Sequence, residues 1–282
     1  MIYLKKKIGF FGTIVLILFS FYYTNNIIKI SRNNDPIMIE IMNYNNEYID
    51  SKIEAIIQDN NIIPGKNGKK INIKDSYYNM KKIGNFDKKL LAFETTYPEE
   101  KLNENYEKYI IGGNKNNSNI SIIYLINDFT NIYEILTILK QKNINIDFFI
   151  SEEIFDSNAE IIKKIIDLGN NIELYSNSYS NHTINKKNEL LRLLSKDKLE
   201  YCINYNKDKK KLINCSKSKL HRILPNIIID NYLYKNIKEK LNNGSIILLK
   251  NKKTIIKELP STIDYIKQKG KKIVLLKNLL EE

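Results

Sequence analysis

The sequence lacks tryptophan altogether and has only two cysteines, two histidines and five prolines among its 282 residues. Two isolated cysteines do not make a metal site, because a structural zinc ion takes four protein ligands. Long polar tracts are also missing, which excludes a disordered chain. A hydrophobic fraction of 43% and a charged fraction of 27% are ordinary for a globular protein. The length is enough for one large domain or two smaller ones.

The formal charge of +13 makes the chain strongly basic. A basic chain can bind nucleic acid, a membrane surface or an acidic polymer. Its lysines are scattered, and no recognisable motif interleaves them with aromatic residues, so we expect no nucleic-acid partner. The abundance of Ile, Lys, Asn and Tyr is typical of an AT-rich coding sequence. The charge therefore reflects either background composition or affinity for an acidic envelope polymer.

The N-terminus carries an apolar run without any charge. Lys5, Lys6 and Lys7 precede this run, which extends from Ile8 to Tyr23. As a helix it would span roughly 24 Å, and flanking isoleucines could extend it toward the ~30 Å core of a bilayer. A cleaved signal peptide has the same form, but no small-residue cleavage site follows the run. We therefore expect an uncleaved anchor within residues 1–30.

The position of the lysines predicts the orientation of this anchor. Positive charge before a membrane span favours a cytoplasmic N-terminus. We accordingly expect a single-pass protein of the cytoplasmic membrane, with everything after Tyr23 on the extracytoplasmic side.

The region 35–113 predicts a small α+β domain. We expect a strand over 37–42, helices over 47–59 and 75–82, and a boundary at Gly112–Gly113.

The chain from residue 119 to 282 alternates between strand and helix patterns. Apolar runs predict strands at 120–126, 146–150, 171–175, 245–249 and 272–276. Helices are predicted after the capping residues Asn131 and Asn158, and over 232–241 and 259–269, with Pro260 in a first turn. This alternation with short connections predicts an α/β domain with a mostly parallel sheet.

The two cysteines flank a polar segment. Cys202 and Cys215 lie on either side of Asp208–Lys209, where a hairpin turn is expected. The two thiols either form a disulfide across paired strands outside the cell or are unrelated.

Five phrases in the second half of the chain share their order and spacing with a known family. They are SIIYLINDF (121–129), INIDFFI (144–150), GNNIELYSNSY (169–179), GSIILLK (244–250) and ELPSTIDYIKQKGKKIVLLKNLL (258–280). Together they resemble the polysaccharide deacetylases (NodB homology, or carbohydrate esterase family 4). The resemblance covers Asn119 to the C-terminus, and 35–113 is similar to the N-terminal extension of some Gram-positive members. It implies a distorted (β/α) barrel, which follows a smaller α+β domain and a transmembrane helix.

The family hydrolyses an acetyl amide or ester with a divalent metal. The metal polarises the carbonyl and activates water, an aspartate takes a proton, and a late histidine acts as the acid. By this resemblance, Asp128 retains the metal-binding aspartate. The catalytic positions become Asn127 and Lys250, and the two metal-binding histidines become Tyr175 and Tyr179. We therefore expect no cofactor, or zinc, cobalt or manganese if the protein is active.

Other residues near the predicted strand ends are further candidates for a binding or catalytic role. Tyr175, Tyr179 and Asn177 form a candidate carbohydrate-binding set or simply fill a vacated pocket. His182 could reach the site of Asp128, whereas His221 is expected at the surface or in the hairpin. The carboxylates Glu152, Glu153 and Glu173 also lie near strand ends.

Three functions remain open at this point. The first is a membrane-anchored pseudoenzyme that binds cell-envelope glycan or a partner. The second is an active carbohydrate N- or O-deacetylase, a hydrolase with a reorganised site. The third is a structural protein of the envelope.

Overall fold

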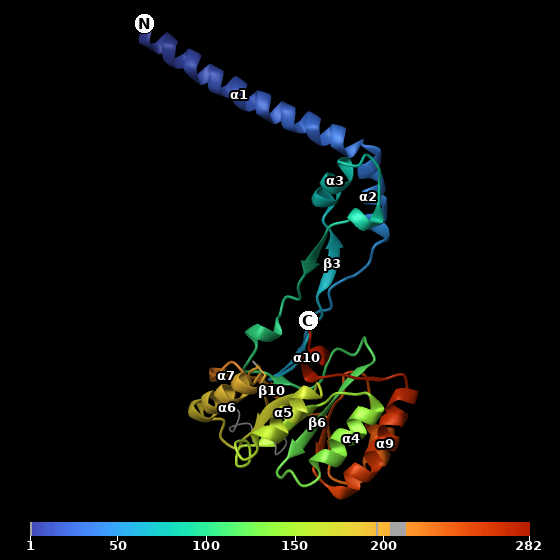
Figure 1. The fold of residues 1–282 in the computed structure, drawn as a ribbon. Helices are drawn as coiled ribbons and strands as arrows, with labels where there is room; N and C mark the ends of the chain where they lie inside the picture. The colour runs from blue at the N-terminus through green and yellow to red at the C-terminus, as the bar shows by residue number, and fades with distance from the viewer. Residues whose placement is uncertain (1, 196, 204–212) are drawn as a thin grey trace. The chain divides into compact units, whose positions relative to one another are not determined.

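The computed structural model describes residues 2–195, 197–203 and 213–282 (Figure 1). The chain divides into two compact units. The smaller unit comprises Met1–Lys52 and Asn67–Thr96, and the larger one comprises Ile53–Lys66 and Tyr97–Glu282. This division differs from a boundary at Gly113, because strands from 53–66 and 97–113 pair with strands of the larger unit.

The smaller unit is built from helices and one antiparallel strand pair. Its elements are α1 (Ile2–Asn33), α2 (Pro36–Glu47), β3 (Gly68–Ile71), α3 (Ile73–Lys81), the 3-10 helix η1 (Lys88–Leu90) and β4 (Phe93–Thr96). A compact cluster of Ile37, Ile41, Ile71 and Met80 holds α2, β3 and α3 together. The helix expected over 75–82 is thus present as α3.

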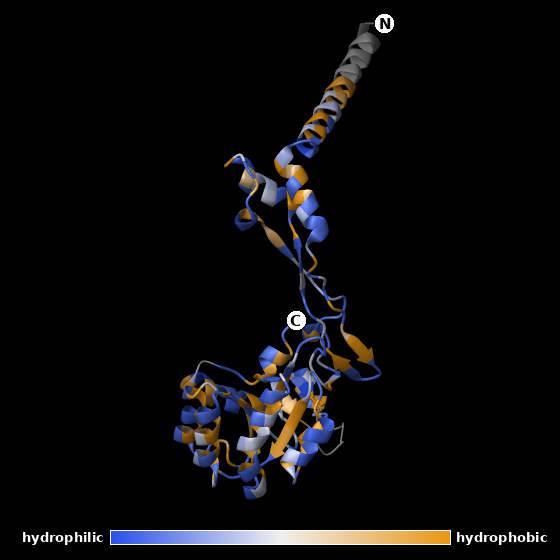
Figure 2. Ribbon diagram, turned by 90° about the vertical axis from the view of Figure 1, so that its right-hand side faces the viewer, coloured by the Kyte–Doolittle hydropathy of each residue, from blue (hydrophilic) through white to orange (hydrophobic). Residues whose placement is uncertain are grey.

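Helix α1 carries the long apolar segment of the chain. The part from Ile14 to Asn33 has a mean hydropathy of 1.3 and is long and apolar enough to cross a membrane. Figure 2 shows its apolar residues in orange, with paler and blue residues between them and toward the end of the helix. A signal sequence near an N-terminus meets the same criterion.

Two expected elements of the smaller region were wrong. Residues 37–42 form part of α2 rather than a strand, because Asp35 caps the helix by accepting from the N–H of Ile37 at 3.0 Å, and Pro36 occupies its first turn. Residues 48–59 are not helical, since α2 ends at Glu47. Strand β1 (Ile56–Gln58) pairs with β2 (Asn61–Ile63) across a tight turn in which Asp59 adopts a left-handed φ of 53°.

The larger unit contains two sheets. The first has the order β11 (Ile227–Ile229), β12 (Ile246–Lys250), β6 (Asn119–Ile126), β7 (Asp147–Ser151) and β8 (Asn171–Tyr175), with β13 (Lys272–Ile273) also on β6. All of its pairs are parallel. The second has the order β1, β2, β5 (Tyr109–Ile110), β10 (His221–Ile223) and β9 (Tyr201–Ile203). The expected parallel α/β architecture is confirmed.

Helices cover the outside of the first sheet. They are α4 (Ile132–Lys142), α5 (Ala159–Asp167), α6 (Asn181–Leu194), α8 (Leu233–Lys240) and α9 (Lys253–Gln268). Helix α7 (Ile213–Lys217) packs against β10 of the second sheet, and η2 (Leu102–Glu104) and α10 (Leu276–Leu279) lie elsewhere. Alternate residues of β6 face two cores. Ile122 and Tyr124 join the core under the helices, whereas Ile123 and Leu125 join an inner core shared by both sheets.

The C-terminal elements differ in detail from the expectation. Helix α9 begins at Lys253, so Pro260 lies inside the helix rather than in its first turn. A continuous buried stripe that includes Ile255, Leu259 and Ile263 explains this, since packing outweighs the loss of one backbone hydrogen bond. The last strand ends at Ile273, and the chain then enters α10.

A side chain completes the junction between the two sheets. Strands β8 and β9 lie next to each other there, with no backbone ladder between them among the described residues. The Glu173 carboxylate, fully buried on β8, accepts from the N–H of Tyr201 at 3.1 Å and from that of Glu200 at 3.1 and 3.3 Å. This carboxylate therefore satisfies two N–H groups that a neighbouring strand would otherwise bind.

The structure joins Cys202 and Cys215 in a disulfide. Cys202 lies on β9 and Cys215 on the short helix α7, so the bond links a strand to a helix rather than two paired strands. The turn expected at Asp208–Lys209 lies outside the described residues. Strand β10, which follows α7, pairs with β9 in parallel.

Replacing both cysteines with alanine should lower the free energy of unfolding by about 2–4 kcal/mol, because the bond restricts the unfolded chain. Urea unfolding followed by circular dichroism measures the change. Dithiothreitol should shift the wild-type midpoint and leave that of the double variant unchanged. Equal midpoints for wild type and variant without reductant would contradict the prediction.

Candidate functional site

The residues that the family resemblance assigns to the site follow the carboxyl ends of β6, β8 and β12. In a parallel α/β sheet, this edge is where ligands usually bind. Asn127 and Asp128 are exposed just after β6, and Tyr175 and Lys250 are half-buried at the ends of β8 and β12. The region is therefore placed as expected, but its side chains are engaged in local contacts.

Asp128 organises the loop that leads into α4. Its Oδ1 accepts from the N–H of Thr130 at 2.9 Å and from Nδ2 of Asn251 at 3.3 Å. Hydrogen bonds from Thr130, followed by that from Asn251, hold the pKa of this carboxyl below its usual range. The retained acid is thus a charged group that already serves as a turn acceptor.

Asn251 connects the ends of β6 and β12, a role that the sequence reasoning missed. Its Oδ1 accepts from the hydroxyl of buried Tyr124 at 3.0 Å and lies 3.5 Å from Nδ2 of Asn131. Its Nδ2 also donates to the carbonyl of Asp128 at 3.0 Å. The feature of the sequence that could have pointed to Asn251 is its position directly after the predicted strand 245–249 and Lys250.

Lys250 bonds toward the neighbouring strand β11. Its Nζ lies 2.6 Å from Oδ1 of Asp230, the residue that follows β11, and Nζ of Lys252 lies 3.9 Å from the same oxygen. The side chain at this position is therefore an ammonium group engaged with Asp230, where the resemblance expects an imidazole.

Tyr179 is fully buried, at 0% exposure, in the core under the helices. Its hydroxyl lies 3.0 Å from the carbonyl of Leu174 on β8 and 3.4 Å from that of Ile203 on β9, and it accepts from the N–H of Ile203 at 3.2 Å. Burial raises the pKa of this phenol above its usual range. The side chain therefore connects β8 to β9, beside the bonds made by Glu173.

The backbone at Tyr179 adopts a left-handed φ of 47°, which is uncommon for a residue other than glycine. Oγ of Ser176 accepts from the N–H of Ser178 and of Tyr179, each at 3.1 Å, and holds this turn. The turn is what directs the phenol inward.

The candidate carbohydrate-binding set also includes Tyr175 and Asn177. These two residues have different environments from that of Tyr179. Tyr175 packs against the inner core shared by the two sheets, and Asn177 is exposed. The structure thus distributes the expected aromatic pair between two different cores.

A polar groove lies beside these strand ends. Its lining residues are Glu152, Glu153, His182, Thr183, Lys186 and Lys187. Glu152 accepts from Oγ1 of Thr183 at 2.9 Å and from the hydroxyl of Ser176, so it ties β7 to the start of α6. Lys187 is buried and pairs with Asp156 at 2.8 Å. His182 is exposed at this groove.

His221 was expected at the surface or in a hairpin and is instead buried on β10. Its ring stacks on Tyr106 at 4.4 Å, and Nε2 lies 3.3 Å from Oδ1 of Asn103. Burial lowers the pKa of His221 to about 4. Leu220 precedes it, and Ile223 and Leu224 follow Arg222, which is the apolar signal that could have placed it in the interior.

The donor set does not fit the family's metal. Among residues 2–195, 197–203 and 213–282, no group of three or more His, Cys, Asp and Glu is arranged to hold a metal ion. Tyr179 uses its hydroxyl on backbone groups, and a phenol with a raised pKa is a poor ligand. Metal ligation through this residue would require breaking the β8–β9 contacts.

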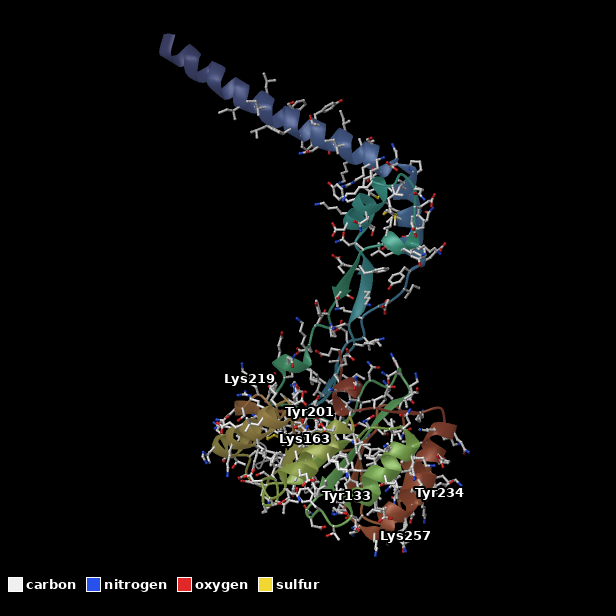
Figure 3. All side chains as sticks on the ribbon, viewed as in Figure 1. Tyr133, Lys163, Tyr201, Lys219, Tyr234 and Lys257 are labelled. Carbon is white, nitrogen blue, oxygen red and sulfur yellow. A yellow bond between two sulfur atoms is a disulfide. The ribbon has the colours of Figure 1, made fainter. Side chains whose placement is uncertain are left out.

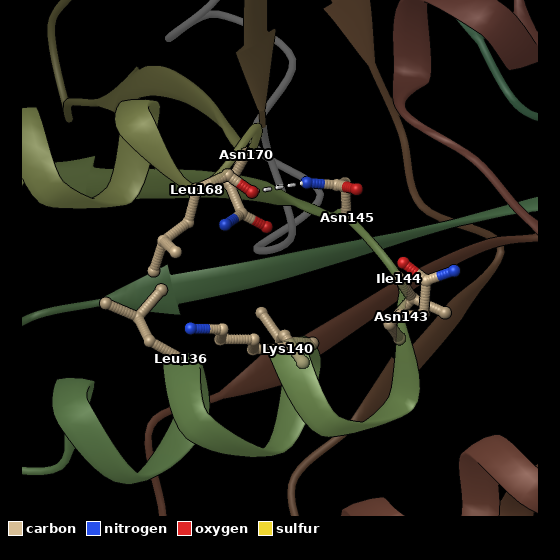
Figure 4. Close-up of a pocket in the computed structure, with 8 residues that line it drawn as sticks. Leu136, Lys140, Asn143, Ile144, Asn145, Leu168 and Asn170 are labelled. Atoms are coloured by element: carbon tan, nitrogen blue, oxygen red, sulfur yellow. Dashed lines mark hydrogen bonds between the residues drawn. The ribbon is translucent and has the colours of Figure 1, made fainter.

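Other hollows of the larger unit lie elsewhere. One, shown in Figure 4, is formed where α4 leads into β7, and Nδ2 of Asn145 donates there to the carbonyl of Leu168 at 2.8 Å. It lies at the amino end of β7, opposite the candidate site. A shallower one lies between α4 and α9, where Tyr133 and Lys257 are on the outer surface (Figure 3).

Tyr179→Phe should lower the free energy of unfolding by about 1–3 kcal/mol, because the buried N–H of Ile203 loses its acceptor. Tyr133→Phe removes the hydroxyl of an exposed tyrosine and serves as the matched control, with little expected change. Urea denaturation of both variants measures the difference. Equal losses in the two variants would show that the Tyr179 hydroxyl contributes nothing specific.

His221 should make the protein sensitive to acid. Its folded pKa of about 4 lies below the ordinary value of 6.5, so only the unfolded chain takes up this proton between those two values. The free energy of unfolding is therefore unaffected by the titration of His221 above pH 6.5. It falls by about 3 kcal/mol as the pH is lowered toward 4. His221→Phe keeps the ring stacking and should lose less stability over that range. Parallel pH profiles for the two proteins would contradict this assignment.

Comparison with known proteins places the fold. No family model matches the chain. The uncharacterized protein YlxY of Bacillus subtilis (strain 168) is 28% identical over 166 residues, which are 56% of this chain and 50% of that protein. The chain thus spans about half the length of this curated relative.

Solved structures give a broader match. BA3943, described as a CE4 family pseudoenzyme from Bacillus anthracis, has a TM-score of 0.65 and 23% identity, covering 88% of this chain and 96% of that one. The Bc1960 peptidoglycan N-acetylglucosamine deacetylase has a TM-score of 0.53 and 20% identity, covering 61% and 92%. The larger unit, with its parallel strands and covering helices, therefore has the fold of the CE4 (NodB-type) polysaccharide deacetylases.

Proposed function

We propose that this chain is a membrane-anchored, extracytoplasmic protein that uses a deacetylase fold to bind cell-envelope glycan and has lost the family's metal-dependent hydrolysis. One observation carries the proposal. The position that the resemblance assigns to a metal-binding histidine holds Tyr179, whose hydroxyl is buried and bonded to the backbone of Leu174 and Ile203. A ligand that serves as a structural link between strands is no longer available to a metal.

The remaining substitutions support the same conclusion. Asn127 cannot accept a proton from water as a carboxylate does, because an amide is not a base at neutral pH. Lys250 forms an ion pair with Asp230, and Asp128 accepts from Thr130 and Asn251. Lys250, Asp128 and Tyr179 thus make structural bonds at the positions that the resemblance assigns to the site.

The similar structures support loss of activity as a natural outcome in this fold. BA3943 is described as a pseudoenzyme, and a mutant of BA3943 is described as having restored enzymatic activity. The deacetylase Bc1960 is described as acting on N-acetylglucosamine of peptidoglycan. Peptidoglycan is accordingly the glycan that we propose as the partner of this chain.

Two further features favour an envelope location. Helix α1 contains a segment long enough to span a membrane, and three lysines precede its apolar run. The disulfide between Cys202 and Cys215 suits an oxidising, extracytoplasmic compartment. The net charge of +13 also favours contact with an acidic envelope polymer.

The second candidate is an active deacetylase with a different ligand arrangement. The observation that favours it is Asp128, which keeps the family's carboxylate, exposed and with a lowered pKa. An exposed anionic oxygen at the strand ends is accessible to a cation from solvent.

Metal analysis separates the two candidates. The full chain in detergent should retain no zinc, cobalt or manganese after incubation and desalting, and it should release no acetate from acetylated chitooligosaccharide or peptidoglycan. Asp128→Ala is the matched variant, since it removes the retained ligand. Near-stoichiometric metal in the wild type that disappears in Asp128→Ala, together with acetate release, would establish the active deacetylase instead.

Glycan binding is tested independently by sedimentation with purified peptidoglycan. We expect the full chain to co-sediment equally with and without EDTA, because binding in this proposal needs no metal. A chain that stays in the supernatant under both conditions would exclude the glycan-binding role. Binding abolished by EDTA would contradict the metal-free mode.

A further inference from the structure

The smaller unit carries a short segment that combines positive charge with exposed apolar surface. Residues 81–89, with the sequence KKIGNFDKK, hold four lysines and one aspartate. The segment connects the end of α3 to η1. Its side chains are exposed except that of Phe86, which is half-buried.

The segment turns sharply where α3 ends. The N–H groups of Ile83 and Gly84 both donate to the carbonyl of Met80 at 2.9 Å, and Gly84 has a φ of +87°. A glycine in this conformation is the usual end of a helix, because other residues avoid it. The turn leaves Ile83 at the tip, with 62% of its surface exposed.

The far side of the segment is fixed to the core of the smaller unit. The ring of Phe86 lies 6.2 Å from that of Tyr44 on α2, and Nζ of Lys88 lies 4.7 Å over the Tyr44 ring. Asp87 accepts from the N–H of Lys89 at 2.9 Å. The segment is therefore a defined surface that presents Ile83 and lysines outward.

The segment also lies close to the point where α1 ends. Asp35, two residues after α1, binds Nζ of Lys81 at 2.5 Å and the hydroxyl of Tyr77 at 2.9 Å. These bonds join the last turn of α3 directly to the start of α2. Figure 1 shows α3 beside α2, next to the end of α1.

Among the residues that the structure describes, the ammonium groups of two of the lysines contact neither an acidic side chain nor an aromatic ring. Lys81 is paired with Asp35, and Lys88 is placed over Tyr44. Lys82 and Lys89 are exposed and make no ion pair with any residue that the structure describes. Two unneutralised ammonium groups thus flank the exposed side chain of Ile83 within a short stretch of chain.

We propose that the segment 81–89 binds the phosphate headgroups of anionic phospholipids in the leaflet from which α1 emerges. The inference rests on the proposed membrane anchor. If α1 crosses the bilayer and ends at Asn33, Asp35 and the attached end of α3 lie within a few residues of the lipid surface. Lysines attract anionic headgroups there, and an apolar side chain such as Ile83 enters the headgroup boundary.

A lipid surface fits this segment better than a glycan does. Glycan sites commonly offer an aromatic face, whereas the exposed side chains here are four lysines, Ile83, Asn85 and one carboxylate, Asp87. Continuity with the membrane span makes the encounter intramolecular, so few charges suffice to hold the contact. The contact fixes how the smaller unit rests on the membrane.

The absence of tryptophan makes this inference directly measurable. Ile83→Trp introduces a single fluorescent reporter at an exposed tip, where the larger ring costs no core packing. Tyr232→Trp, at another exposed position on the larger unit, is the matched control. Each full chain is reconstituted into phosphatidylcholine vesicles with or without phosphatidylglycerol, using acyl-chain-brominated lipid as the quencher. Flotation of the vesicles is measured in parallel.

We expect the Ile83→Trp protein to float with the vesicles and lose about half of its emission when phosphatidylglycerol is present, since an interfacial side chain lies near the upper acyl chain. Adding Lys82→Glu and Lys89→Glu should abolish this loss, and so should about 1 M salt, where the Debye length falls to about 3 Å. The Tyr232→Trp control should remain bright throughout.

Three outcomes would overturn the inference. Flotation without quenching of the Ile83→Trp protein would leave the anchor intact and remove the lipid contact. Quenching that is equal in purely neutral vesicles, or unchanged by the two glutamates, would exclude headgroup recognition. Failure of the protein to float would remove the proposed anchor and this inference together.

Discussion

The larger unit depends on how its two sheets are joined where β8 meets β9. Backbone pairing does not complete this junction among the described residues, so side chains supply the missing partners. Glu173 accepts from the N–H groups of Glu200 and Tyr201, and Tyr179 binds Leu174 on one side and Ile203 on the other. Because buried backbone groups without partners are costly, these two side chains determine whether β9, and with it β10 and β5, stays in place.

Under the proposed function, the same junction accounts for a tyrosine at the position that the resemblance assigns to a metal-binding histidine. A residue cannot close two strands and ligate a metal at once, and Tyr179 closes the strands. The other positions follow the same pattern of local use, with Lys250 bonded to Asp230 and Asp128 bonded to Asn251. These three side chains thus make structural bonds at the strand ends of a fold that the chain shares with the deacetylases. This separation of fold from site chemistry is common among widely used folds.

The sequence predicted much of the larger unit because its strands are continuous apolar runs, and such runs are typical of parallel sheets buried on both faces. The strand from Ile120 to Ile126 is an example. The prediction from sequence failed where a local turn or capping signal outweighed the hydrophobic periodicity. Asp35 and Pro36 begin a helix in a β-branched run, and the left-handed Asp59 forms a turn in a run with helical spacing. The position of Asn251 after a strand was visible in the sequence, but its bonds were not, because Tyr124, Asp128 and Asn131 lie far before it in the chain.

The bonds of Tyr179 also constrain how this lineage could change. A single substitution of Tyr179 by histidine would remove the hydroxyl from a buried N–H before any ligand set existed to benefit from the imidazole. If the chain has lost the family's hydrolysis, as we propose, regaining a metal ligand at this position would lower the stability of the fold before any metal could bind. The hydroxyl of Tyr179 would then set a stability cost on reversal.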